Sequence, residues 1–366
     1  MIETGRREQR GRANDIYKEL MDTGVKKYNI SLSSSPSYLF NNLSSSSKYY
    51  SYVTNSEPAP RCFIISSAIL EKGETSSNIS KASYKDLVEI QNSTLFDLKI
   101  DGIIHTYLAL STLDKLILFN NNGSRMLAHF PQQTGIKLPE ETDNLIYWTS
   151  VTPVASPSVP DKEFLVASNS VGSLFGAYPK GPETFEREKL FSFADQTAVV
   201  AMACDKTKGI VGAGNATGFI IFLQIAAPKK LEPIGSLQLN KDSVPITSVG
   251  VLYRGANLFV AGDANGLVSV IECSSEKPRV LCTIQAHQQA LTALVCHPTK
   301  SVFATAGEDS MVTVWEVNED EKLNLVFDYQ LANKIPTGVA FVGENSSSLL
   351  IAQQDHINLA YFKDLV

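Results

Sequence analysis

The sequence predicts an all-β fold, a single seven-bladed β-propeller with a short N-terminal arm or helix, and three observations lead to it. A hairpin pattern of apolar strand, small residues, polar turn and alternating apolar strand recurs at a spacing of roughly 45 residues, which is typical of a propeller blade. Helical periodicity is nearly absent after residue 30. Hydrophobic residues make up 43% of the 366 residues and charged residues only 19%, which fits a sheet-rich core.

The hairpin copies follow one another to the end of the chain. They are YLALSTLDKLILFN (107–120), LVASNSVGSLFGAY (165–178), IVGAGNATGFIIFL (210–223), FVAGDANGLVSVIE (259–272), FATAGEDSMVTVWE (303–316) and LIAQQDHINLAYF (350–362). Further strands precede three copies, at 199–205, 246–252 and 291–297, and strands at 48–53 and 61–70 supply a more degenerate seventh blade. Gly, Asn and Asp at the turns suit tight hairpins. The two chain ends are expected to share a blade and so close the ring.

Residues 1–27 are expected to form a basic arm, and residues 28–366 the propeller. Four arginines precede a short helix candidate that is capped by Asn14 or Asp15 and carries one apolar strip. The arm is either a solvated tail or a segment that folds on the acidic surface of a partner. In the second case the partner-binding residues are Arg6, Arg7, Arg10, Arg12, Ile16, Tyr17 and Leu20.

Charge and composition exclude several functional classes. The formal net charge is −6, although residues 1–30 carry more basic than acidic side chains, so the body of the chain is acidic. Broad binding to nucleic acid or to an anionic membrane is therefore not expected. The five cysteines form no CxxC pair and are expected to be reduced thiols of an intracellular protein. Because no signal peptide or membrane-spanning run is found, the predicted location is the cytoplasm.

The segment AHQQALTALVCHPTKSVFATAGEDSMVTVWEV (286–317) contains a hydroxyl, an imidazole and a carboxylate. It resembles a complete repeat of the WD-repeat family. The resemblance implies a structural set of His287, Thr305, Asp309 and Trp315, in which the indole bonds the hydroxyl, the hydroxyl the imidazole and the imidazole the carboxylate. A catalytic set would need an exposed nucleophile and an oxyanion hole. A threonine buried beneath Trp315 supplies neither, so no catalytic residue is expected.

The other copies lack this set. The tryptophan position is expected to hold Tyr178, Leu223 or Ile271, and the aspartate position Thr217 or Asn265, so that these blades depend on packing. The ordered series NNLS (41–44), VGAGNATGFIIF, VAGDANGLVSVIE and TAGEDSMVTVWEV resembles the family of WD repeat-containing protein 54, which combines one propeller with a short arginine-containing arm.

Three further patterns have two interpretations each. GAGNATG (212–218) is either a phosphate loop or a hairpin turn, and the strand pattern after it favours the turn. Cys282, Cys296 and His297 lack the paired spacing of zinc ligands, so no metal and no cofactor is expected. Ile146, Tyr147 and Trp148, within the irregular segment 127–163, are either aromatic anchors or the first strand of the next blade, which we favour.

These observations together predict a non-catalytic protein-interaction scaffold that binds protein partners and no small-molecule substrate. By fold analogy it is a candidate component of the ciliary axoneme or the microtubule cytoskeleton, since the acidic surface of tubulin suits the arginine arm. One alternative is a soluble adaptor subunit of a ubiquitin-ligase or trafficking complex. Another is an enzyme with its site in the central channel, but the sequence shows no convergent set of acids or histidines.

Overall fold

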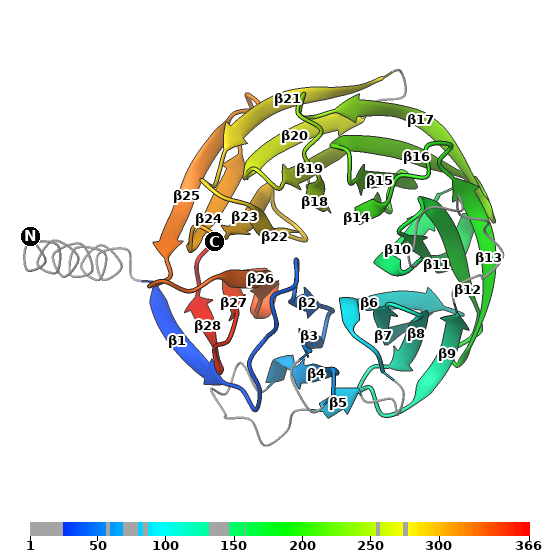
Figure 1. Cartoon of the computed structure of the whole chain (residues 1–366), viewed down its shortest axis with the longest axis horizontal. Helices are drawn as coiled ribbons and strands as arrows, with labels where there is room; N and C mark the ends of the chain where they lie inside the picture. Colours follow the sequence, from blue (N-terminus) through cyan, green and yellow to red (C-terminus); the bar gives the residue numbers. More distant parts are fainter. Residues whose placement is uncertain are drawn as a thin grey trace, which may run out of the picture.

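The chain forms a ring of seven four-stranded antiparallel sheets around a central opening, as the computed structural model shows (Figure 1). The structure describes residues 25–55, 59–68, 80–82, 87–131, 146–157, 159–253, 257–273 and 277–366. The predicted all-β, seven-bladed propeller is thereby confirmed. No helix in these described ranges combines the length and hydropathy that a membrane crossing requires.

We number the blades 1 to 7 in the order of their innermost strands. Blade 1 is β2 (Ser44–Ser45), β3 (Tyr49–Thr54), β4 (Arg61–Ser66) and β5 (Ser80–Ala82). Blade 2 is β6 (Ile90–Ile100), β7 (Ile103–Thr112), β8 (Lys115–Asn120) and β9 (Met126–Pro131). Blade 3 is β10 (Trp148–Ser156), β11 (Val159–Asn169), β12 (Ser173–Gly181) and β13 (Thr184–Ser192). Blade 4 is β14 (Val199–Asp205), β15 (Ile210–Asn215), β16 (Phe219–Ala227) and β17 (Lys230–Gln238).

The remaining blades follow the same order. Blade 5 is β18 (Ile246–Val251), β19 (Leu258–Asp263), β20 (Leu267–Cys273) and β21 (Pro278–Gln285). Blade 6 is β22 (Leu291–Cys296), β23 (Val302–Gly307), β24 (Met311–Val317) and β25 (Leu323–Gln330). Blade 7 is β26 (Pro336–Val342), β27 (Ser348–Gln353), β28 (Asn358–Lys363) and β1 (Lys26–Ser31), with a short 3₁₀ turn η1 (Glu344–Ser346).

Both ends of the chain build blade 7, as the sequence predicted. β1 pairs antiparallel with β28, from Lys26 opposite Lys363 to Ser31 opposite Asn358. The strand therefore begins within the segment 1–27 that was assigned to the arm. Its only buried side chain is Ile30, so hydrophobic patterning could not place its start. Closure by β1 leaves the ring without a gap between its first and last blades.

The core lies between neighbouring blades. The second strands β15, β19, β23 and β27 are buried along their whole length, because another blade covers each of their faces. This explains their continuous apolar runs. The outer strands β17, β21 and β25 instead mix exposed and half-buried positions.

Two ambiguous segments become strands and turns of this ring. Trp148 is the first residue of β10, is 1% exposed, and its ring centroid lies 5.2 Å from that of Phe175. The strand interpretation is therefore right for Trp148 and its aromatic-anchor interpretation is wrong, whereas Ile146 and Tyr147 lie just before β10 and are half-buried. The GAGNATG segment ends β15 and turns at Gly218, whose φ of 82° suits a hairpin.

Candidate functional site

Blade 6 holds the polar set that the sequence singled out. His287 Nδ1 lies 3.0 Å from Asp309 Oδ1, and His287 Nε2 lies 2.8 Å from Thr305 Oγ1. The second carboxylate oxygen of Asp309 accepts the backbone N–H of Gln288 at 2.9 Å. This joins the loop before β22 to the hairpin between β23 and β24.

Thr313 is a member of the network that the sequence analysis missed. The Trp315 indole donates to Thr313 Oγ1 at 2.7 Å, not to Thr305, and the two threonine hydroxyls lie 2.7 Å apart. Thr313 pairs with Thr305 across the two strands and precedes Trp315 by two residues, so all three side chains share one face. The sequence feature that could have identified Thr313 is its i, i+2 spacing from Trp315.

The imidazole and the Thr305 hydroxyl of this network are too deeply buried for a catalytic set. His287 is 1% exposed and Thr305 is fully buried, so neither the imidazole nor the hydroxyl can meet a substrate. Burial alone would raise the pKa of the Asp309 carboxyl. Hydrogen bonds from His287 and from the backbone of Gln288 and Met311 outweigh it and hold that pKa below its ordinary value.

Three other blades use a different polar device at the same hairpin. Asn169, Asn215 and Asp263 end β11, β15 and β19, and each side-chain Oδ1 accepts the backbone N–H groups two and four residues later. In blade 6 the corresponding residue is Gly307. A Cβ there would lie 2.6 Å from the His287 ring, so the imidazole occupies the space that an Asx side chain fills elsewhere.

One predicted correspondence is wrong. Trp315 pairs with Phe303, and the equivalent pair in blade 3 is Ala177 with Leu165. Ala177 therefore holds the tryptophan position, and Tyr178 points to the other face of β12. The sequence could not show this, because Ala177 and Tyr178 are adjacent and only the hairpin register decides which of them holds the tryptophan position.

The predicted arm residues Arg6, Arg7, Arg10, Arg12, Ile16, Tyr17 and Leu20 lie outside the described residues. Lys27, at the end of the predicted arm, belongs to β1. Its Nζ donates to Tyr329 Oη at 2.7 Å and lies 4.7 Å from the centre of that ring. This contact joins blade 7 to blade 6.

The cysteine and histidine near β22 behave as core residues. Burial raises the pKa of the Cys296 thiol. Burial, followed by the charge of Lys300, lowers the pKa of His297. Within the described part of the chain, no group of three or more His, Cys, Asp or Glu side chains could hold a metal ion.

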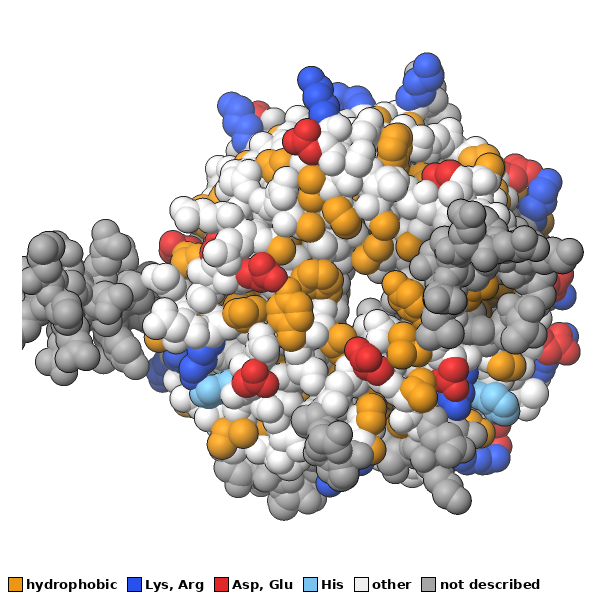
Figure 2. Space-filling model, in the orientation of Figure 1, with side chains coloured by type: hydrophobic (Ala, Val, Ile, Leu, Met, Phe, Trp, Pro, Cys, Tyr) orange, Lys and Arg blue, Asp and Glu red, His pale blue; other side chains and the backbone are white. Residues whose placement is uncertain are grey.

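The central channel contains a cavity of about 250 Å³ whose lining side chains are all uncharged. They are serine, threonine, asparagine, proline, methionine and aliphatic residues from the innermost strands and from residues 41–45. Residues 41–45 of the chain itself enter this channel. Figure 2 shows the opening rimmed mainly by hydrophobic and uncharged side chains.

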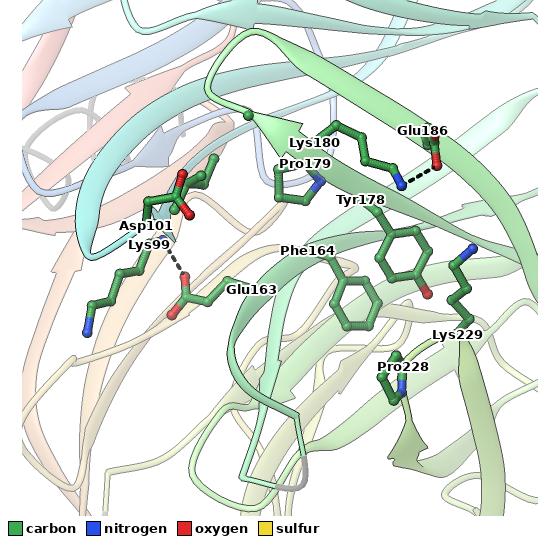
Figure 3. A pocket seen from close by; sticks show the side chains of 12 residues that line it. Lys99, Asp101, Glu163, Phe164, Tyr178, Pro179, Lys180, Glu186, Pro228 and Lys229 are labelled. Carbon is green, nitrogen blue, oxygen red and sulfur yellow. Dashed lines mark hydrogen bonds and ion pairs between the residues drawn. The ribbon is translucent and has the colours of Figure 1, made fainter.

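A second cavity, of about 290 Å³, lies at the end of the ring where the innermost strands finish. The β6–β7 turn, the start of the described part of β11, β12 and the β16–β17 turn surround it (Figure 3). Phe164 and Tyr178 line it with stacked rings, 4.6 Å between centroids and 24° between planes. We call it the blade 2–3 pocket.

The β6–β7 hairpin projects beside this pocket. β6 and β7 continue to the pair Ile100–Ile103, whereas their neighbour β8 ends at Asn120, opposite Tyr107. The tip exposes two isoleucines, Ile103 at 62% and Ile104 at 67%.

Comparison with known proteins supports the fold. No protein-family model matches the chain, and no curated protein matches its sequence. Among solved structures, a chain of the crystal structure of the mitotic checkpoint complex is similar, with a TM-score of 0.67 and 11% identity over 92% of this chain and 90% of that chain. At this identity the likeness shows a shared fold. The resemblance to the WD-repeat family stays a prediction from the residues.

Proposed function

We propose that the chain is a protein-interaction scaffold without catalytic activity. The proposal rests on one observation, the positions of the exposed large apolar side chains. Ile103 and Ile104 are exposed at a hairpin tip on one face of the ring, and Tyr38 and Ile357 on loops of the other. Exposed apolar residues on loops of a rigid ring suit protein partners.

The side chains that line the central channel support the proposal that the chain has no catalytic activity. General acid–base or nucleophilic chemistry needs ionisable or activated side chains that converge on one point. The channel cavity is lined by uncharged side chains. The buried polar side chains of blade 6 form hydrogen bonds with one another within the blade. The similar fold of a chain from a multi-protein complex also fits a scaffold.

A more specific form of the proposal, the finer form, uses two further sequence features. They are the arginine arm and the ordered hairpin series, which resembles the family of WD repeat-containing protein 54. We propose that the arm binds an acidic surface, with tubulin or another axonemal protein as partner and the cilium or cytoskeleton as location. The alternative is a soluble cytoplasmic adaptor of a ubiquitin-ligase or trafficking complex that binds through the propeller loops. The two forms differ in whether charge on the arm is required.

Sedimentation with polymerised microtubules tests the finer form. Deletion of residues 1–24 removes the four arginines and keeps β1, which begins at Lys26. A matched full-length control replaces the four arginines with glutamine. The arm proposal expects the wild-type chain to sediment at low salt, and both variants and a high-salt sample to stay in solution. Equal sedimentation of all samples would contradict it.

Cross-linking mass spectrometry on the native protein tests the scaffold itself. Cross-links to the same partner proteins from lysines on the propeller loops are expected in either form. A protein recovered without any reproducible partner, from both cytosol and a cytoskeletal fraction, would contradict the scaffold proposal. Cross-links in cytosol alone would favour the soluble adaptor.

A further inference from the structure

Blade 6 has the least protected outer edge of the ring. The outermost strand of each sheet pairs on one side only, and lysine, arginine, proline or a covering segment commonly protects such an edge. Among the outermost strands of the seven described sheets, β25 (LNLVFDYQ) alone contains no lysine, arginine or proline. The other six contain, among such residues, Lys27, Lys81, Pro131, Arg187, Pro233 and Arg279. The edge of β25 therefore lacks the protection that its own side chains could supply.

The same strand exposes two adjacent apolar side chains. Leu325 is 50% exposed and Val326 is 45% exposed, and both lie in the middle of β25. We call them the β25 apolar pair. Removing such a pair from water is favourable, so the pair suits a segment that covers the strand.

The hairpin between β24 and β25 is acidic. Glu319, Asp320 and Glu321 are exposed and form no ion pair with the described residues. Lys322 supplies one positive charge against these three carboxylates. Arg279, which Glu321 also attracts, already pairs with Glu272 at 2.6 Å. The hairpin therefore keeps a net negative charge at the start of β25.

Residues 1–24 join the ring at the other end of β25. Val25, which follows them, packs against the same apolar cluster as Tyr329, and Lys27 Nζ donates to Tyr329 Oη at 2.7 Å. Figure 1 shows β25 ending beside the start of β1. From Tyr329, the β25 apolar pair lies three and four residues back along the strand, or about 10 and 13 Å, and the acidic hairpin begins after about 20 Å.

The sequence of residues 1–24 carries complementary side chains in the same order. In a helix, which rises about 1.5 Å per residue, Leu20 and Ile16 would lie about 8 and 14 Å from Val25, and the four arginines about 20 to 29 Å from it. The apolar strip of the predicted helix thus matches the β25 apolar pair, and the arginines match the acidic hairpin. Residues 6–12 contain four arginines and one glutamate, so their charge is opposite to that of the hairpin.

We propose that residues 6–20 of the chain dock on the outer side of blade 6, with the predicted helix over the β25 apolar pair and the arginines on the β24–β25 hairpin. The tether at the end of β25 gives this segment a high effective concentration at the site. Docking orders the segment and covers the unprotected edge. This contact lies within one chain, so it goes beyond the scaffold function and does not rest on it. An acidic partner that binds the arm has to displace the contact.

Hydrogen exchange followed by mass spectrometry tests the docking. The measured quantity is the exchange rate of backbone amides in peptides that cover residues 318–328, compared between the full-length chain and the chain without residues 1–24, which keeps β1. Every variant is measured in both forms, so that a direct effect of the substitution on β25 cancels in the ratio of the two rates. Peptides from β17, the outermost strand two blades away, serve as the internal control.

In the wild type, the peptides should exchange about tenfold more slowly in the full-length chain, as they would if the segment were docked about nine-tenths of the time. The ratio should fall to near one when Glu319→Lys is combined with Asp320→Lys, and also when the four arginines are replaced by glutamine. The matched control combines Glu89→Lys with Asp242→Lys. It reverses the same number of exposed carboxylates in loops on the other face of the ring and should leave the ratio unchanged.

Leu325→Ser tests the apolar part of the contact. It should lower the ratio severalfold, whereas Ile104→Ser, an equally apolar change at the β6–β7 hairpin tip, should leave it unchanged. Both side chains are exposed in the ring, so both variants should fold.

Three results would overturn the proposal. The first is equal exchange of the wild-type peptides with and without residues 1–24. The second is slower exchange confined to another part of the ring, which would place the segment elsewhere. The third is a loss of protection in the Glu89 and Asp242 control as large as that in the hairpin variant, which would remove the charge pairing from the argument.

Discussion

Asn41 is the residue whose replacement most directly tests how the N-terminal segment holds the ring together. The segment 32–43 runs from β1 over blade 7 into the channel, where Asn41 meets two innermost strands. Its Nδ2 donates to Thr247 O at 3.3 Å in β18, and its Oδ1 accepts Ser248 Oγ at 3.0 Å and Leu294 N at 3.1 Å in β18 and β22. Its φ is 54°, in the left-handed region that asparagine tolerates and alanine does not.

These observations set the expected magnitudes. Three side-chain hydrogen bonds at about 1 kcal/mol each give a loss of about 3 kcal/mol for Asn41→Gly, which keeps the backbone unstrained. Asn41→Ala adds about 1 kcal/mol for a left-handed alanine, or about 4 kcal/mol in total. Asn41→Asp keeps the Oδ1 acceptor and should lose about 1 kcal/mol.

Urea unfolding, followed by the fluorescence of Trp148 and Trp315, measures the free energy of unfolding of each variant. The order of stability should be wild type, Asn41→Asp, Asn41→Gly, Asn41→Ala. Losses below about 1 kcal/mol for both Asn41→Gly and Asn41→Ala would refute the claim that this side chain fastens the inner ring. An alanine variant as stable as the glycine variant would refute the backbone part of the reasoning.

Three further predictions concern blade 6, each measured by the same urea titration. Gly307→Ala should lower the free energy of unfolding by about 2 kcal/mol, because the added Cβ meets the His287 ring. This loss should be smaller when His287 is also replaced by alanine. An equal loss in both backgrounds would contradict the contact. Thr313→Val should cost about 2 kcal/mol, since the Trp315 indole loses its acceptor; a neutral result would show that indole to be satisfied elsewhere. The folded-state pKa of Asp309 is lowered, so its stabilising effect is complete above about pH 5 and is lost as the pH falls below the ordinary value of 3.8. The stability gap between wild type and Asp309→Asn should therefore close at acid pH, and a constant gap would contradict the linkage.

The ring could be predicted from the sequence because its period is carried by many residues at once. Apolar second strands and turn residues repeat at each blade, so the loss of one signal leaves the others. β1 has no such redundancy: its one buried residue, Ile30, gives no pattern, and only pairing with β28 defines it. The blade 2–3 pocket was equally hidden, since the placement of Tyr178 over Gly176 depends on a side-chain conformation and not on a repeat.

The polar set of blade 6 could be located but not completed. His287, Thr305 and Asp309 stand at repeat positions, whereas Thr313 follows from strand register alone. The other blades explain why the set can be lost. An Asx residue that caps its own hairpin, as Asn215 does, needs no partner from another loop, so one local change replaces a five-residue network.

Blade 6 is one of several blades to which the closing segment is fastened. The segment first bonds to blade 7, through Leu32 N to Ile357 O at 2.7 Å, and then reaches blade 6, through Asn41 N to Thr292 O at 2.8 Å. The Tyr38 hydroxyl also donates to Glu308 in the blade 6 hairpin.

Blade 7 is assembled from both chain ends and so depends on non-covalent pairing, whereas blade 6 is continuous and braced by the buried network. A segment anchored on the braced blade resists the opening of β1 from β28 even when that pairing frays. The complete polar set therefore stands in one of the blades that hold the closing segment.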